Sequence, residues 1–174
     1  MTKKIKKLYI FDFDETLVHA KGSIYVKNKN NNKVKSLTHH EYYKYSLNED
    51  EYYDISDFDT VVIEKINKPI MDLLIKHQNK AVILTARDKP EPIKNFLLKL
   101  GIDVPINAIG INNPKSNSVF VNAERKKSWI KLAITTKNYN YIEFWDDNEL
   151  NIEKAETLKE EFPDITLITH LVKI

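Results

Sequence analysis

The chain has 174 residues, of which 42% are hydrophobic and 30% are charged. This length and balance predict one folded domain with at most a small appended element, rather than two domains or a disordered chain. The chain has no cysteine, which excludes a disulfide framework, a thiol nucleophile and a thiolate metal site. The net charge of +2 gives no support for strong overall attraction to nucleic acid. The apolar run over residues 8–13 is too short for a signal peptide or membrane span, so we expect a cytoplasmic protein.

The first predicted elements are a buried strand and an excursion from it. The apolar and aromatic run over residues 7–11 is typical of a parallel strand, and it ends at Asp12. Residues 23–26 and 34–37 flank a turn that is rich in asparagine and lysine. This pattern predicts a β-hairpin that lies outside the main sheet.

A helix start and an irregular stretch follow the hairpin. Thr38 and Glu41 have the spacing of a capping box, in which each side chain bonds to the backbone amide of the other residue. A helix over residues 41–47 is therefore predicted. Residues 48–59 are acidic and show no clear period, and we interpret them as ordered loop. The excursion as a whole covers about residues 19–59.

The second half of the chain alternates helices with strands. Apolar residues at helical spacing predict helices, with Pro69 opening the first and Gly101 capping the second. The predicted helices cover residues 69–75, 89–100, 124–137 and 149–161. Short apolar runs predict strands over residues 81–84, 107–111, 141–145 and 165–169.

Strands that alternate with helices imply a parallel sheet that is covered on both faces. We therefore predict a three-layer α/β/α fold of Rossmann-like type with a small inserted cap. Ligands of such sheets bind at the carboxyl ends of the strands. Asp12, Thr85 and the acidic pair at 146–147 all fall at predicted strand ends. These distant segments are expected to meet at one edge of the sheet.

Two carboxylates stand at the end of the first predicted strand. Asp12 and Asp14 are two residues apart, and in an extended chain that spacing points both side chains the same way. Their repulsion and desolvation cost free energy unless a divalent cation or a proton stabilises them. A site with oxygen ligands alone suits Mg²⁺.

Four motifs in order give the chain a resemblance to a known family. They are Asp12-Phe13-Asp14-Glu15-Thr16 after the first strand, Leu84-Thr85-Ala86-Arg87 after the second, a lysine at a helix start, and Trp145-Asp146-Asp147-Asn148 after a third strand. With these four motifs in this order, the chain resembles the haloacid dehalogenase superfamily of phosphatases. Each motif alone is weak, but four with the expected strand contexts are specific.

The resemblance implies a reaction through a covalent intermediate. Asp12 would attack phosphorus and form an aspartyl-phosphate. Asp14 would protonate the leaving oxygen and then take a proton from the water that hydrolyses the intermediate. Mg²⁺ would be held by Asp12, the main-chain carbonyl of Asp14 and Asp147, and we include Asp146 in the candidate metal set.

The second and third motifs imply the substrate contacts. Thr85, Ala86 and Arg87 would bind phosphoryl oxygens, with the Thr85 hydroxyl stabilising charge in the transition state. Lys126 is the best match to the third motif, because it shares the face of the apolar residues three and four positions further on. Lys127 is rotated by about 100° from that face.

Each assignment has a simpler structural alternative. Asp12 and Asp14 could form a solvated turn after a strand, and residues 146–148 could cap a helix. Lys126 could lie on a solvated helix face, and Arg87 could pair with a surface acid instead of contacting a substrate phosphate. The combination of four motifs favours the catalytic interpretation.

The excursion over residues 19–59 gives information about the substrate. By the resemblance it lies where the superfamily places small caps, and its size implies an open site that suits a macromolecular end or a sizeable molecule. The chain is similar to the polynucleotide 3′-phosphatase-like branch, so nucleic-acid ends and nucleotides are candidate substrates. The first motif also resembles phosphoprotein phosphatases that act on polymerase tails, although residues 85–87 and the insert depart from them. A non-catalytic binding module of the same fold is a further alternative.

Lysines and tyrosines are interleaved in the excursion over residues 19–59, a mixture that could follow a phosphate backbone and stack on bases. They are Lys27, Lys29, Lys33, Lys35 and Lys44 with Tyr25, Tyr42, Tyr43 and Tyr45. The favoured interpretation is that the tyrosines pack together while the lysines keep an edge strand soluble. We expect no membrane partner, and the sequence gives no signal for a particular oligomer.

Overall fold

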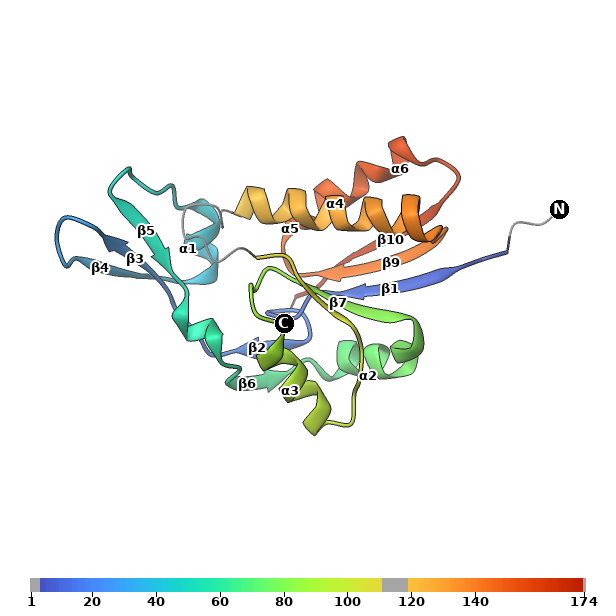
Figure 1. Cartoon of the computed structure of the whole chain (residues 1–174), viewed down its shortest axis with the longest axis horizontal. Helices are drawn as coiled ribbons and strands as arrows, with labels where there is room; N and C mark the ends of the chain where they lie inside the picture. Colours follow the sequence, from blue (N-terminus) through green and yellow to red (C-terminus); the bar gives the residue numbers. More distant parts are fainter. Residues whose placement is uncertain (1–3, 111–118, 174) are drawn as a thin grey trace.

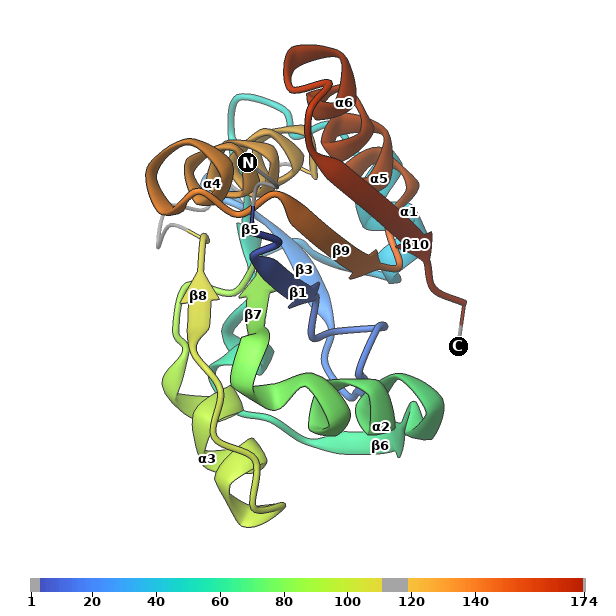
Figure 2. The same cartoon turned by 90° about the vertical axis from the view of Figure 1, so that its right-hand side faces the viewer.

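A computed structural model describes residues 4–110 and 119–173 of the chain. A central sheet is built from β1 (Lys7–Phe11), β7 (Ala81–Thr85), β8 (Ile106–Ala108), β9 (Tyr141–Asp146) and β10 (Thr166–Leu171). The strand order is β10-β9-β1-β7-β8, and every neighbouring pair is parallel. Helices lie against both faces (Figures 1 and 2), which confirms the predicted α/β layers around a parallel sheet.

Each face of the sheet packs against its own set of helices. One face is covered by α4 (Val119–Lys137), α5 (Glu149–Glu156) and α6 (Leu158–Glu161), and the other by α2 (Lys68–His77), a 3₁₀ turn η2 (Gln78–Lys80) and α3 (Glu91–Lys99). Side chains of β1 alternate between the two cores. Phe11 packs in the core that holds Leu74 and Ile93, whereas Ile10 packs in the core that holds Ile130. Burial on both faces explains why residues 8–11 of the strand are apolar or aromatic.

The helices and strands of the second half have the predicted order, with differences at their ends. Helix α4 begins at Val119, before the predicted start at Glu124, and the single helix predicted over residues 149–161 is divided at Thr157. Strand β8 is three residues long, and Ile111, at the end of the predicted strand, lies outside the described residues. Gly101 has a φ of 75° after α3, as expected of a left-handed cap.

The excursion between β1 and α2 forms a small unit of its own. The chain leaves through β2 (Val18–Ala20) and returns through β6 (Ile63–Ile66), which pair antiparallel. Between them lie β3 (Ile24–Asn28), β4 (Val34–Leu37), α1 (His39–Lys44), β5 (Glu51–Asp54) and a 3₁₀ turn η1 (Ser56–Asp59). We call residues 21–62 the insert. Figure 1 shows the insert beyond the end of the sheet toward which β1 points.

The prediction of loop over residues 48–59 is wrong, because this stretch contains β5 and η1. Strand β5 pairs with β3, so the insert is a three-stranded sheet in the order β4-β3-β5 rather than a hairpin alone. Tyr53 is the only buried side chain of β5, which leaves a weak alternating pattern. The predicted capping box is confirmed: the Glu41 amide donates to Thr38 Oγ1 at 3.2 Å, and the Thr38 amide donates to Glu41 Oε2 at 2.8 Å.

Candidate active site

The carboxyl ends of β1 and β9 form a switch point in the sheet. From β1 the chain continues to β7 and β8 on one side and later to β9 and β10 on the other, so the strand order reverses between β1 and β9. Ligands of open parallel sheets bind outside the strand ends at such a point. Asp12 follows β1, Asp146 ends β9 and Thr85 ends β7. The structure therefore brings these three segments together at one edge.

Three carboxylates gather at this edge beside one buried lysine. Oxygens of Asp12, Asp146 and Asp147 all lie within 4.8 Å of one another. Lys126 Nζ donates to Asp12 Oδ1 at 2.7 Å and to Asp146 Oδ2 at 2.6 Å. Only 2% of Lys126 and 5% of Asp12 are exposed. These charges therefore interact with little of the solvent screening that weakens surface pairs.

Burial perturbs the ionisation of this cluster. Burial raises the pKa of Asp12 well above its usual range; Lys126 opposes this shift, and the charges of Asp146 and Asp147 add to it. Burial alone would lower the pKa of Lys126, but attraction and hydrogen bonds from Asp12 and Asp146 outweigh it and raise that pKa. The ammonium therefore stays charged. Further positive charge at the three carboxylates would stabilise the arrangement.

Helix α4 presents Lys126, rather than Lys127, to the cluster. Lys126 lies on the buried face of the helix with Asn122 and Ile130, four residues before and after it. Lys127 is half-buried and is not among the residues that line the cavity at the sheet edge. The geometry thus favours Lys126 as the lysine of the third motif, as the helical spacing predicts.

Asp146 and Asp147 differ in what they face. Asp146 is fully buried, and besides Lys126 it accepts hydrogen bonds from the Asn148 backbone amide at 3.0 Å and the Asn151 side-chain amide at 2.8 Å. Asp147 lines the cavity, whereas Asp146 does not. Asp147 is therefore the better-placed ligand for an ion, and Asp146 positions Lys126. Asn148 caps α5 through its side chain, so the capping alternative holds for that residue.

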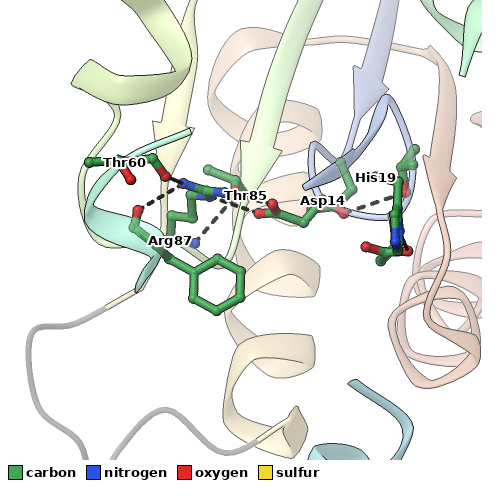
Figure 3. Close-up of polar contacts among 9 residues, drawn as sticks. Asp14, His19, Thr60, Thr85 and Arg87 are labelled. Carbon is green, nitrogen blue, oxygen red and sulfur yellow. Dashed lines mark hydrogen bonds and ion pairs between the residues drawn. The ribbon is translucent and has the colours of Figure 1, made fainter. Parts of the chain in front are cut away.

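Asp14 forms a two-point ion pair with Arg87 from the loop after β7 (Figure 3). Arg87 Nε and Nη2 donate to the two carboxylate oxygens at 2.8 Å each. Its Nη1 donates to the backbone carbonyls of Phe58 and Thr60 in the insert, at 2.8 and 2.9 Å. These contacts use four of the five N–H hydrogens of a guanidinium. Arg87 thus pairs with an acid of the site itself, and ties that acid to the insert.

Asp12 and Asp14 both line the cavity at this edge, as their spacing predicts, but their carboxylates have different partners. Asp12 belongs to the group of clustered carboxylates and Asp14 does not. The physical reason is the turn that follows them. Glu15 has a φ of 57°, and its amide donates to the Val18 carbonyl at 2.8 Å. The chain reverses directly after Asp14, so the extended geometry on which the prediction rests ends there.

The loop after β7 is packed tightly at the sheet edge. Thr85 is buried, its Oγ1 accepts from the Arg87 amide at 3.2 Å, and both Thr85 and Ala86 line the cavity. Gly110 lies against this loop, because its amide donates to the Arg87 carbonyl at 3.0 Å. A Cβ at Gly110 would stand 2.3 Å from the carbonyl oxygen of Ala86. The close approach of the two backbones therefore requires glycine at this position.

A cavity of about 120 Å³ lies over the cluster, between the sheet edge and the insert. The side outside the insert, which we call the floor, is mostly polar and consists of Asp12, Asp14, Glu15, Thr85, Ala86, Arg87, Asp88, Val119, Asn122, Lys126, Asp147, Asn148 and Asn151. The apolar side, which we call the roof, consists of Ile24, Tyr42, Ile55 and Phe58 from the insert. The roof residues, as well as Asn122 and Asn151, could not be recognised as site residues from the sequence. The one available signal was for Asn122, which lies one helical turn before Lys126.

Several lysines and tyrosines of the insert make contacts with their neighbours. Lys27 forms an ion pair with Asp54, and Lys35 Nζ lies 4.7 Å from the centre of the Tyr45 ring. Such contacts favour the packing interpretation over a nucleic-acid surface. The side chain of Tyr43, which belongs to the same sequence pattern, lies outside the described part of the chain.

The fold and the site together define a class: a parallel α/β protein with a buried carboxylate and lysine cluster at the switch point of its sheet. Comparison of the chain with protein-family models, curated proteins and solved structures gave no match. Within residues 4–110 and 119–173, no helix has both the length and the apolar character needed to cross a membrane.

Proposed function

We propose that the chain is a magnesium-dependent phosphomonoester hydrolase of the haloacid dehalogenase type, which forms an aspartyl-phosphate on Asp12. The observation that carries the proposal is the 2.7 Å contact between Asp12 and buried Lys126, with Asp147 in the same cluster at the switch point. A carboxylate that attacks a phosphoryl group needs positive charge beside it, because both partners are anionic. The order of the four sequence motifs supports the same reaction.

The residues present fit Mg²⁺, which prefers oxygen ligands and completes its shell with water and substrate. Asp12, Asp147 and the main-chain carbonyl of Asp14 would hold the ion, while Asp146 stays engaged with Lys126. When bound, the ion would offset the charge of the carboxylates and of the phosphoryl oxygens. Asn151 Oδ1 is buried on the cavity wall and has no hydrogen-bond partner among the described residues, which suits a water molecule at such a site.

Each side chain then has a defined role in the reaction. Asp12 attacks phosphorus and forms an acyl phosphate as the ester oxygen of the substrate leaves. Lys126 and the Thr85 hydroxyl stabilise negative charge on the phosphoryl oxygens. Asp14 gives a proton to the leaving oxygen and later takes one from the attacking water, which releases phosphate and restores Asp12. Arg87 is a positioning residue that aims Asp14 at the leaving oxygen.

Hydrolysis of p-nitrophenyl phosphate, with Mg²⁺ and with EDTA, tests the proposal. We expect activity that needs Mg²⁺, and a fall in kcat of at least ~10³-fold in Asp12→Asn, because the amide is a poor nucleophile. Asp72→Asn makes the same chemical change at an exposed acid of α2 and should keep the wild-type rate. A wild-type rate in Asp12→Asn would contradict the proposal.

A second measurement separates the enzyme from its alternatives. Mass spectrometry of acid-quenched protein should find the phosphoryl group on the peptide that contains Asp12. If the wild-type protein hydrolyses p-nitrophenyl phosphate no faster than Asp12→Asn does, and carries no phosphoryl group, the chain is a binding module instead. Phosphate release from 3′-phosphorylated oligonucleotides, nucleotides and phosphopeptides at several salt concentrations compares the substrate classes, because contacts to a nucleic-acid backbone weaken with salt.

A further inference from the structure

The cavity over the proposed catalytic centre has two unlike walls. Its floor holds the charged and amide side chains, and its roof is apolar and comes entirely from the insert. Strand β1 points toward the insert (Figure 1), and Asp12, which directly follows β1, lines the cavity. In-line displacement places the leaving oxygen opposite the attacking one. The leaving group therefore extends from the floor toward the roof.

The roof is held in place by packing within the insert. The Tyr42 ring meets Tyr53 edge to face, with 5.0 Å between the ring centres, and burial raises the pKa of its hydroxyl, which therefore stays neutral. The Phe58 ring packs so closely on Gly22 that a Cβ there would lie 3.1 Å from it. A roof fixed in this way presents apolar surface of defined shape to whatever enters the cavity.

Phe58 lies beside Arg87, which holds the residue that would protonate the leaving oxygen. Its ring centre is 5.1 Å from the guanidinium carbon of Arg87, and its carbonyl accepts from Arg87 Nη1 at 2.8 Å. The same guanidinium binds Asp14 through Nε and Nη2. Because Asp14 must reach the leaving oxygen, the first atoms of the leaving alcohol lie close to the roof.

Building on the proposed hydrolase activity, we infer that the substrate is a monoester whose alcohol carries a compact aromatic ring next to the ester oxygen. A ring placed on Ile55 and Phe58 removes apolar surface from water on both sides. On Ile55 and Phe58 themselves, the hydroxylated carbons of a sugar would instead lose hydrogen bonds to water, because these two side chains offer none in return. The cavity, at about 120 Å³, is smaller than the ~300–1,000 Å³ of sites that enclose a drug-sized ligand. It suits a phosphoryl group and one ring.

Three esters of primary alcohols test the inference: benzyl phosphate, ethyl phosphate and ribose 5-phosphate. Their leaving groups have similar intrinsic reactivity, so differences in kcat/KM report on the roof. We expect kcat/KM for benzyl phosphate to exceed the other two values by at least ~10-fold, the scale on which apolar pockets discriminate. A phosphotyrosyl peptide distinguishes the sources of such an ester. Free phosphotyrosine is the matched comparison, because both compounds release a phenol of similar reactivity. Where benzyl phosphate is the preferred alkyl ester, a higher kcat/KM for the peptide than for free phosphotyrosine assigns the aromatic ester to a protein side chain, and a lower one assigns it to a small molecule.

A variant of the roof connects the preference to the structure. Ile55→Ser places a hydroxyl on the roof and should lower the ratio of kcat/KM for benzyl phosphate to that for ethyl phosphate severalfold. The ratio cancels any general loss of activity or folded protein. Val34→Ser is the matched control, because Val34 is an exposed residue of the insert that does not line the cavity. An unchanged ratio in Ile55→Ser would overturn the role of the roof.

The outcomes separate this inference from the function on which it rests. A wild-type ratio near one, with measurable hydrolysis of ethyl phosphate or ribose 5-phosphate, overturns the aromatic substrate and leaves the hydrolase proposal standing. Absence of Mg²⁺-dependent hydrolysis of every ester, p-nitrophenyl phosphate included, overturns the hydrolase proposal and the inference together.

Discussion

Ion pairs at the sheet edge and in the insert differ in burial and in the length of chain that they connect. Lys126 joins Asp12 across 114 residues, and only 3% of its side chain is exposed. Lys27 joins Asp54 within the insert, with 38% and 18% of the two side chains exposed. Solvent and side-chain entropy offset most of what an exposed pair contributes, whereas a buried pair keeps its attraction. Charge can therefore act strongly on a substrate at the edge, while the insert contributes shape.

Removal of Lys126 should give the largest effect. Lys126→Met leaves Asp12 and Asp146 buried without their cation, so we expect a loss of about 3–5 kcal/mol in the free energy of unfolding in EDTA. The kcat should fall by at least ~10²-fold, because charge on the phosphoryl oxygens is no longer stabilised. Lys127→Met is the matched control and should change both quantities little. Urea unfolding measures the free energy of unfolding, and p-nitrophenyl phosphate hydrolysis measures kcat. Equal losses in the two variants would contradict a special role for Lys126 over Lys127.

The edge could be predicted because its signals are local in the sequence. An apolar run ends at Asp12 and another ends at Asp146, and the rules for parallel sheets bring the two strand ends together. The helical spacing within α4 also selects Lys126. The pair between Asp14 and Arg87 could not be predicted, because it depends on the left-handed turn at Glu15 and on a contact between distant segments.

The insert was predicted less well because pairing, rather than local pattern, holds it together. Strand β5 has one buried side chain, and β2 and β6 are three and four residues long, so their periodicity carries little information. The roof could not be predicted for the same reason. Ile24, Tyr42, Ile55 and Phe58 come from three separate places in the insert, namely β3, α1 and the start of η1, and only the fold shows that they line one cavity.

Arg87 connects the two regions, and its replacement should have an intermediate effect. Arg87→Lys keeps the charge but cannot hold both oxygens of Asp14 and the carbonyls of the insert at once. We expect kcat to fall by about 10–10²-fold through misplacement of Asp14, with a smaller change in KM. Lys89→Met removes an exposed pair between the same loop and Asp59 and serves as the control.

A positioning role for Arg87 also predicts chemical rescue. Added guanidinium should restore part of the kcat of Arg87→Ala, because it can occupy the space beside Asp14, and should not affect Asp12→Asn. Wild-type kcat in Arg87→Lys would show that the edge works without its connection to the insert. A rise in KM with unchanged kcat would assign Arg87 to substrate binding instead.

The smallest effect is expected from Lys27. Its hydrogen bond to Asp54, together with the Ser56 amide, lowers the pKa of Asp54 to about 2. A carboxyl group with a lower pKa in the folded state stabilises the fold above about pH 4 and loses this contribution as the pH falls toward 2. Lys27→Ala should raise the pKa of Asp54 toward its ordinary value, measured by NMR titration.

The same variant should leave the midpoint of urea unfolding at pH 7 and the rate of phosphate release nearly unchanged, because the pair of Lys27 with Asp54 is open to solvent. A pKa that stays near 2 would assign the shift to the backbone amide and side chain of Ser56. A large loss of activity would mean that charges of the insert act on the substrate. In that case the insert would contribute electrostatics as well as shape, and the contrast with the sheet edge would fail.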